Sequence, residues 1–257
     1  MRQAVIRAGL ETLYFTGAYI ALRGLLGGIG EILTLHHVRP ARADAFQPNR
    51  LLEVAPEFLE NVIVELRRSG TELVSLDEMH RRLTTADFGR RFVCLTFDDG
   101  YRDNLTFAYP ILKKHAVPFA VYVPTSFPDR LGDLWWVTLE AAIAAAERID
   151  LAIAGKSCSF RCATVAEKRE TYRALYWILR SLDSEEDLRA IVRDLAARHG
   201  VDPSAFCERL CMSWDELAQL AADPLVTIGA HTVNHLMLRK QPEEVVRREM
   251  LAGADAI

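Results

Sequence analysis

The sequence has no excess of basic residues and few cysteines. Its 31 lysines and arginines against 35 aspartates and glutamates give a formal net charge of −4. Nucleic-acid binding needs basic side chains to neutralise phosphates, so it is not expected here. Half of the 257 residues are apolar and 26% are charged, which is typical of a globular domain that can bury a large core.

Cysteine is scarce, and the five present are an odd number. A chain of this length does not need disulfides to fold, so free thiols and a reducing compartment are expected. Two pairs have three intervening residues instead of the two usual in zinc knuckles, so a four-cysteine metal site is not expected. The cysteines are Cys94, Cys158, Cys162, Cys207 and Cys211.

The N-terminal region, residues 1–30, lacks the pattern of a secretory leader. An apolar run at residues 13–22 follows two arginines, but Glu11 interrupts the approach and no A-x-A cleavage pattern follows. The run is also too short to span a bilayer. Apolar residues at helical spacing predict an amphipathic helix packed on the domain, with loose attachment to a membrane surface as the alternative. A cytoplasmic location is expected.

The stretch FVCLTFDDG, residues 92–100, is the most informative in the chain. It begins as an apolar run typical of a buried strand and ends in Asp98, Asp99 and a glycine, where the backbone must turn. α/β folds place their chemistry at the C-terminal ends of parallel strands. Two adjacent carboxylates raise one another's pKa unless a cation lies between them. Taken alone, the stretch would be an ordinary Asp-Asp-Gly turn.

A second short apolar strand, residues 226–230, leads to His231 and His235. This spacing can place both imidazoles on one face of the chain. Two histidines and one carboxylate make a three-ligand site with an open position for water, as in catalytic zinc sites. Such a pair alone could equally be structural, and it is the combination with the aspartate pair that favours a metal.

The segments TFDDG (96–100) and HTVNH (231–235) resemble the first and second motifs of the polysaccharide deacetylases, the NodB-homology carbohydrate esterases. The resemblance covers residues 31–257 and implies a distorted (β/α) barrel and metal-dependent removal of acetyl groups from N-acetylated sugars. It also implies that Asp98 is the general base, and that Asp99, His231 and His235 hold one divalent metal, expected to be zinc. The adjacency of the two aspartates does not assign these roles.

Three further residues are candidate site groups. His36 lies in a predicted strand at residues 31–38, and its position resembles the general-acid histidine of a circularly permuted branch of the family. A structural histidine bonded to backbone is the alternative. Tyr101, beside the aspartate pair, and Trp135 are candidate substrate contacts, since an aromatic ring can form an apolar platform for a sugar. For Trp135 a place in the core is favoured, because neighbouring tryptophans are usually buried.

The rest of the chain predicts an α/β fold with an insert. The strand before the aspartates, a helix at 105–115 and a strand at 117–123 form a βαβ unit, which implies a parallel sheet. Residues 137–212 are predicted to be a mainly helical insert, with the charged stretch 166–199 forming solvated helix faces. The sequence ends before the Arg-Pro-Tyr-type third motif and the C-terminal Leu-x-His motif of the family, so the barrel is expected to be incomplete, with an exposed sheet edge.

These observations lead to one main functional hypothesis and two alternatives. The main hypothesis is a metal-dependent hydrolase that removes N-acetyl groups from a glycan such as a chito-oligosaccharide. The alternatives are a truncated, non-catalytic domain that binds metal or glycan, and an esterase that removes O-acetyl groups from a polysaccharide. The expected partner is an N-acetylated glycan, and the sequence predicts no oligomeric state.

Overall fold

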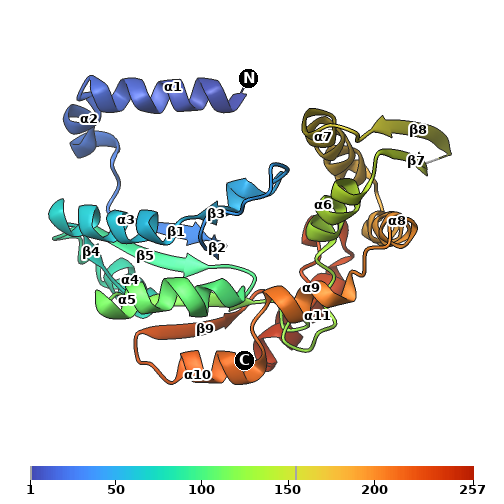
Figure 1. Cartoon of the computed structure of the whole chain (residues 1–257). Coiled ribbons are helices and arrows are strands. Elements are labelled where there is room, and N and C mark those ends of the chain that lie inside the picture. Colours follow the sequence, from blue (N-terminus) through green and yellow to red (C-terminus); the bar gives the residue numbers. More distant parts are fainter. Residues whose placement is uncertain (1, 154) are drawn as a thin grey trace.

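A parallel β-sheet lies at the centre of the molecule and carries helices on its faces (Figure 1). The computed structural model describes residues 2–153 and 155–257, without the side chains of residues 2–4, 23, 25 and 26. The parallel sheet predicted from the sequence is confirmed, with β5 fully buried as its central strand. The sheet consists of β1 (Gly30–Leu35), β4 (Glu72–Leu73), β5 (Phe92–Phe97), β6 (Phe119–Val123) and β9 (Val226–Ala230).

The order of the strands is β1-β5-β6-β9, and β4 pairs with the first two residues of β5. Among the residues that the structure describes, β1 and β9 each have one neighbour in the sheet, so these pairings do not close a ring. The predicted strand at 31–38 is interrupted at His36. The two residues that follow form β2 (His37–Val38), which pairs in parallel with β3 (Glu53–Val54).

Helices pack on the sheet through apolar side chains. Leu59 and Ile63 of α3 and Leu112 of α5 are buried in the same core as Leu95 and Phe97 of β5. The helices and short turns of this part are η1 (Arg50–Leu52), α3 (Pro56–Arg68), α4 (Leu76–Thr85), the π-helical turn η2 (Asn104–Ala108), α5 (Tyr109–Lys114), α10 (Trp214–Ala221), η3 (Leu238–Lys240) and α11 (Glu243–Asp255).

Residues 135–210 form a second group of elements with a core of its own. Trp135, Leu139, Leu175 and Leu188 belong to this core. The helices of the group lie beside the carboxyl end of the sheet in Figure 1. The group is mainly helical, but it also contains an antiparallel hairpin that was not predicted. Its elements are α6 (Trp135–Ala145), β7 (Arg148–Ile153), β8 (Lys156–Arg161), α7 (Val165–Ser181), α8 (Glu185–Arg198) and α9 (Ser204–Leu210).

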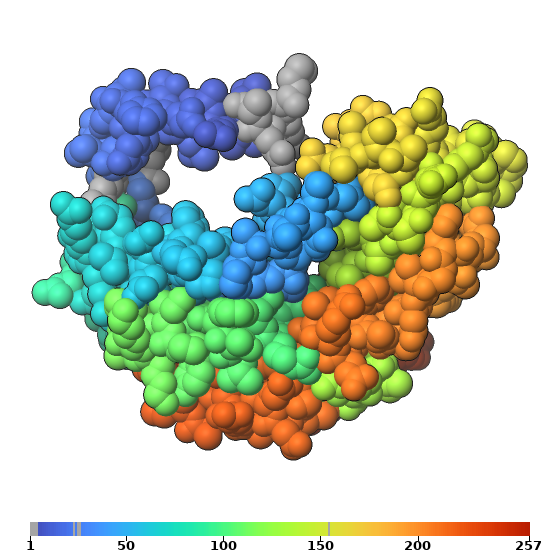
Figure 2. All heavy atoms as spheres, in the orientation of Figure 1, coloured from blue at the N-terminus to red at the C-terminus, as the bar shows by residue number. Residues whose placement is uncertain are grey.

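The N-terminal region forms two helices, α1 (Arg2–Phe15) and α2 (Ala18–Leu26), which stand apart from the rest of the surface in Figure 2. The predicted packing of this region on the domain is wrong for several apolar side chains, because Ile6, Leu10 and Phe15 are 54%, 63% and 80% exposed. An apolar stripe at helical spacing predicts a helix but does not determine what covers it. Within the described part of the chain, no helix has the length and apolarity to cross a membrane.

Candidate metal centre

The predicted site residues follow the carboxyl ends of three strands. β1 and β5 pair in parallel with Leu35 opposite Phe97, and the amide of Asp98 donates to the carbonyl of Leu35 at 2.9 Å. His36 and Asp98 therefore leave the sheet side by side. On the next strands Val123 is opposite Ala230, and the amide of His231 donates to the carbonyl of Val123 at 2.8 Å. The sheet thus brings two motifs more than a hundred residues apart to one edge.

Asp99, His231 and His235 converge as a possible ligand set. Each offers one ligand atom, and these three atoms lie within 4.8 Å of one another. The Oδ1 atom of Asp99 lies 3.3 Å from Nε2 of His235, and the two imidazole rings are 5.0 Å apart at their centroids. One carboxylate and two imidazoles so placed can bind a single divalent ion and leave a position open for water.

Asp99 provides a test of whether these residues fit a metal. Asp99 is 2% exposed, and its Oδ1 atom is buried without a hydrogen bond among the described residues, with only the ion-pair contact to Nε2 of His235 at 3.3 Å. A buried carboxylate oxygen without a hydrogen bond costs free energy of folding, and a cation would supply the missing interaction. The donor set and this oxygen therefore fit a divalent cation.

Charges and burial shift the pKa values of two groups at this edge. Burial raises the pKa of the half-buried Asp98 carboxyl, His231 and His36 oppose this effect, and Asp99 adds to it. Burial also lowers the pKa of His235, although Asp99 opposes that shift. A lowered pKa keeps the His235 imidazole neutral, which is the form that binds metals.

The backbone of the ligand loops is held in an unusual conformation. Asp99, Thr232 and His235 have φ angles of +69°, +65° and +52°, a left-handed region that residues other than glycine rarely adopt. Gly100 also has a positive φ of +58°, and an added Cβ there would lie 3.2 Å from the side chain of Val123. Such conformations persist where surrounding structure fixes them, and they cluster at functional sites.

A family model described as polysaccharide deacetylase matches residues 85–257, which is more than half of the chain and contains both motifs. The chain belongs to the polysaccharide deacetylase family. No protein with curated annotation matches it.

One solved structure agrees with this chain at the level of the fold. The Streptococcus pyogenes deacetylase PplD, solved in complex with acetate, is 18% identical with a TM-score of 0.50. The alignment covers 88% of this chain and 66% of PplD, so the chain spans just under two thirds of that protein. IcaB from Ammonifex degensii is 16% identical with a TM-score of 0.47, and the alignment covers 88% of this chain and 67% of IcaB.

Glu249 of α11 fixes the loop between His231 and His235. Its carboxylate is buried and accepts hydrogen bonds from the backbone amides of Val233 and Asn234 at 3.1 and 2.7 Å. The side-chain amide of Asn234 donates to the second carboxylate oxygen at 2.7 Å. α11 also packs closely here, because an added Cβ on Gly253 would lie 2.9 Å from the carbonyl carbon of Thr232.

A buried ion pair on α8 holds the same loop from the other side. Arg189 and Glu185 are 6% and 4% exposed, and Nη2 of Arg189 lies 2.7 Å from Oε1 of Glu185. Arg189 also donates to the backbone carbonyls of Asn234 and His235, both at 3.4 Å. The prediction that the charged stretch 166–199 forms only solvated faces is therefore wrong at this pair, which points inward.

Neither Glu249 nor the Glu185–Arg189 pair was predicted as part of the site. Their bonds to the loop link residues 15 to 46 positions apart in the chain. An acidic residue in an amphipathic helix, or a Glu and Arg spaced four apart, is common on exposed helix surfaces. The i, i+4 spacing of Glu185 and Arg189 indicates an ion pair on one face of a helix, but it does not indicate that this face is buried.

His36 and Trp135 both line a cavity of about 310 Å³ that also includes Asp99 and His235. His36 is half-buried, and its carbonyl accepts a hydrogen bond from the side-chain amide of Asn104 at 2.8 Å. Trp135 is 5% exposed and belongs to the core of the helical group, so it contributes one edge of the cavity wall from within that core.

Tyr101 has a different position from the one predicted. Its side chain is fully buried and stacks on the His37 ring at a centroid distance of 3.6 Å, and it is not among the residues that line the cavity. The turn at Asp99 and Gly100 directs it inward. A direct contact between Tyr101 and substrate is therefore not supported, and its ring instead packs with His37, which binds Asp103 at 2.6 Å.

Proposed function

We propose that this polysaccharide deacetylase is a metal-dependent hydrolase that removes N-acetyl groups from a glycan. The observation that carries the proposal is the convergence of Asp99, His231 and His235 at a cavity beside Asp98 and His36, with a buried Asp99 oxygen that has no hydrogen bond among the described residues. Zinc is the proposed metal, since the donor set is two imidazoles and one carboxylate.

The side chains around the cluster suit hydrolysis of an amide. A bound divalent ion supplies a Lewis acid that polarises a carbonyl and activates water. We assign Asp98 the task of accepting a proton from the attacking water, because it is adjacent to the ligands without belonging to the cluster. We assign His36 the task of donating a proton to the leaving amine, because β1 places it beside Asp98 at the same edge of the sheet.

The cavity wall supports a sugar as substrate. Trp135, Trp136 and Tyr176 line it together, with the rings of Trp135 and Tyr176 5.4 Å apart at their centroids. Aromatic faces provide apolar surfaces on which a sugar ring can pack, and their N–H and O–H groups can bind its hydroxyls.

The test is hydrolysis of an N-acetylated chito-oligosaccharide, followed by mass spectrometry of the glycan and assay of released acetate. The protein should remove acetyl groups with zinc, lose activity with a chelator and regain it when zinc returns. An O-acetylated polysaccharide is the second substrate in the same assay. Acetate from that ester alone would identify an esterase, and glycan binding without release from either substrate would show a binding domain.

A further inference from the structure

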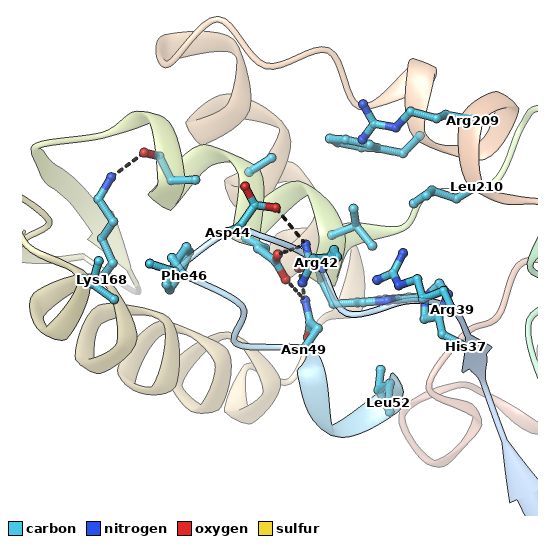
Figure 3. A pocket seen from close by; sticks show the side chains of 18 of the residues that line it. His37, Arg39, Arg42, Asp44, Phe46, Asn49, Leu52, Lys168, Arg209 and Leu210 are labelled. Carbon is cyan, nitrogen blue, oxygen red and sulfur yellow. Dashed lines mark hydrogen bonds and ion pairs between the residues drawn. The ribbon is translucent and has the colours of Figure 1, made fainter. Parts of the chain in front are cut away.

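A second and larger cavity, of about 730 Å³, lies between the loop that follows β2 and the helical group (Figure 3). It adjoins the cavity at the metal centre, because Asn49, Leu52 and Trp136 line both. Asn49 holds this shared wall together, since its side-chain amide donates to Glu140 at 2.8 Å and to the carbonyl of Trp136 at 3.2 Å.

The lining of this cavity is basic, in contrast to the chain as a whole. Four of its side chains are cations and two are carboxylates, whereas the whole chain has a formal net charge of −4. A concave surface with charge of one sign concentrates ligands of the opposite sign. The cations are Arg39, Arg42, Lys168 and Arg209, and the carboxylates are Asp44 and Glu140.

Two of these cations, Arg39 and Arg42, have N–H groups that no hydrogen bond in the described part of the chain uses. Arg39 binds Glu53 at 2.6 Å, and Arg42 binds Glu140 at 2.8 Å. Nη2 of Arg42 also lies 3.2 Å from Oε1 of Glu53. Even so, Nε of Arg39 and Nε of Arg42 are buried without a hydrogen-bond partner in the described part of the chain. A buried donor without an acceptor is costly, and a ligand with several acceptor oxygens would satisfy these groups.

Lys168 and Arg209 form no ion pair with any carboxylate that the structure describes. Lys168 donates to the carbonyl of Ala144, and the guanidinium of Arg209 lies over the Phe206 ring at 4.9 Å. Phe46 and Trp136 add aromatic surface to the same wall. The cavity therefore combines unpaired positive charge with flat apolar faces, which suits a sugar ring that carries an anionic group.

We propose that this cavity, here called the basic pocket, binds an anionic substituent of the glycan on a sugar next to the one that is deacetylated. The identification of the ligand as a glycan rests on the proposed function. The group that binds carries negative charge and acceptor oxygens. It is either the carboxylate of a uronic acid or a phosphate.

The test measures binding to the whole chain, kept free of metal with a chelator so that anions cannot bind through a metal ion. Isothermal titration calorimetry is carried out with glucuronate, inorganic phosphate and neutral N-acetylglucosamine. Lys168→Ala and Arg209→Ala should each weaken binding of the preferred acidic probe about tenfold, because each removes a charge-assisted contact. Their effect on the neutral sugar should be small, and added salt should weaken only the acidic probes.

Arg68→Ala is the matched control, because Arg68 is 81% exposed on α3 and does not line the basic pocket. It should bind all three probes as the unchanged chain does. Tighter binding of glucuronate than of phosphate would identify a carboxylated glycan, and the reverse a phosphorylated one. Failure of both acidic probes to bind, or unchanged binding in Lys168→Ala and Arg209→Ala, would overturn the proposal.

A parallel zinc titration separates this proposal from the proposed function. Lys168→Ala and Arg209→Ala should bind zinc as the unchanged chain does, since neither residue belongs to the metal cluster. Anion binding with no zinc binding would contradict only the metal-dependent mechanism. Zinc binding without anion binding would contradict only the basic pocket.

Discussion

At the scale of single residues, Asp98 and Asp99 are neighbours in the chain with different surroundings. Asp99 is buried within reach of His235, whereas Asp98 is half-buried beside the cluster. Asp98→Asn should therefore keep its zinc and lose turnover by about 10²–10⁴-fold, the usual contribution of a general base. Asp99→Asn should lose zinc. Metal analysis and acetate release check both variants, and equal loss of zinc would show that their roles are not divided in this way.

His36 is the second residue whose role can be isolated. His36→Gln removes the proposed proton donor while leaving all three metal ligands in place, so kcat should fall about 10²-fold at constant zinc content. His80→Gln on α4 is the control, because His80 is exposed and lies outside both cavities. If the two substitutions changed kcat equally, the leaving amine would not depend on His36.

At the scale of elements, α11 positions the loop between His231 and His235 through Glu249. Glu249→Gln removes the negative charge from three hydrogen bonds to Val233 and Asn234, which loosens the segment between the two histidines. Zinc affinity should fall about 10–100-fold, as is typical when a group that orients a metal ligand is changed. Competition with a chromogenic chelator measures it.

Glu243→Gln is the control for this substitution, because the Glu243 side chain is 89% exposed at the first residue of the same helix. It should bind zinc with unchanged affinity. A similar loss in both variants would mean that α11 acts through its overall stability and not through the contacts of Glu249.

Elements whose formation depends on residues close together in the sequence could be predicted from it. The buried strand β5 and its Asp-Asp-Gly turn are encoded within nine residues, and the start of α10 is fixed by a capping box in which Ser213 accepts from Glu216 and Glu216 from Ser213. The β7–β8 hairpin was missed, although Ile149 and Ile153 alternate with polar or exposed positions. The contacts of Arg189 and Glu249 depend on tertiary packing, which no local pattern encodes.

At the scale of the whole molecule, the metal should stabilise the fold. A ligand that binds only the folded state at 100 times its dissociation constant adds about 2.7 kcal/mol to the free energy of unfolding. For a chain of this size that corresponds to a rise in Tm of about 5–10 °C. Zinc should produce this rise in the unchanged chain and not in His231→Ala, as measured by thermal unfolding. An equal rise in both would place the stabilising zinc elsewhere.

The buried carboxylate of Asp99, whose Oδ1 atom has no hydrogen bond among the described residues, and its left-handed backbone have a consequence for the evolution of this chain. Without metal, both features oppose folding, so Asp99→Asn should melt at a higher temperature than the unchanged chain when both are kept in chelator. A neutral amide is less costly to bury, and asparagine adopts this backbone conformation readily. Selection for stability alone would thus replace Asp99, and its retention requires selection for activity.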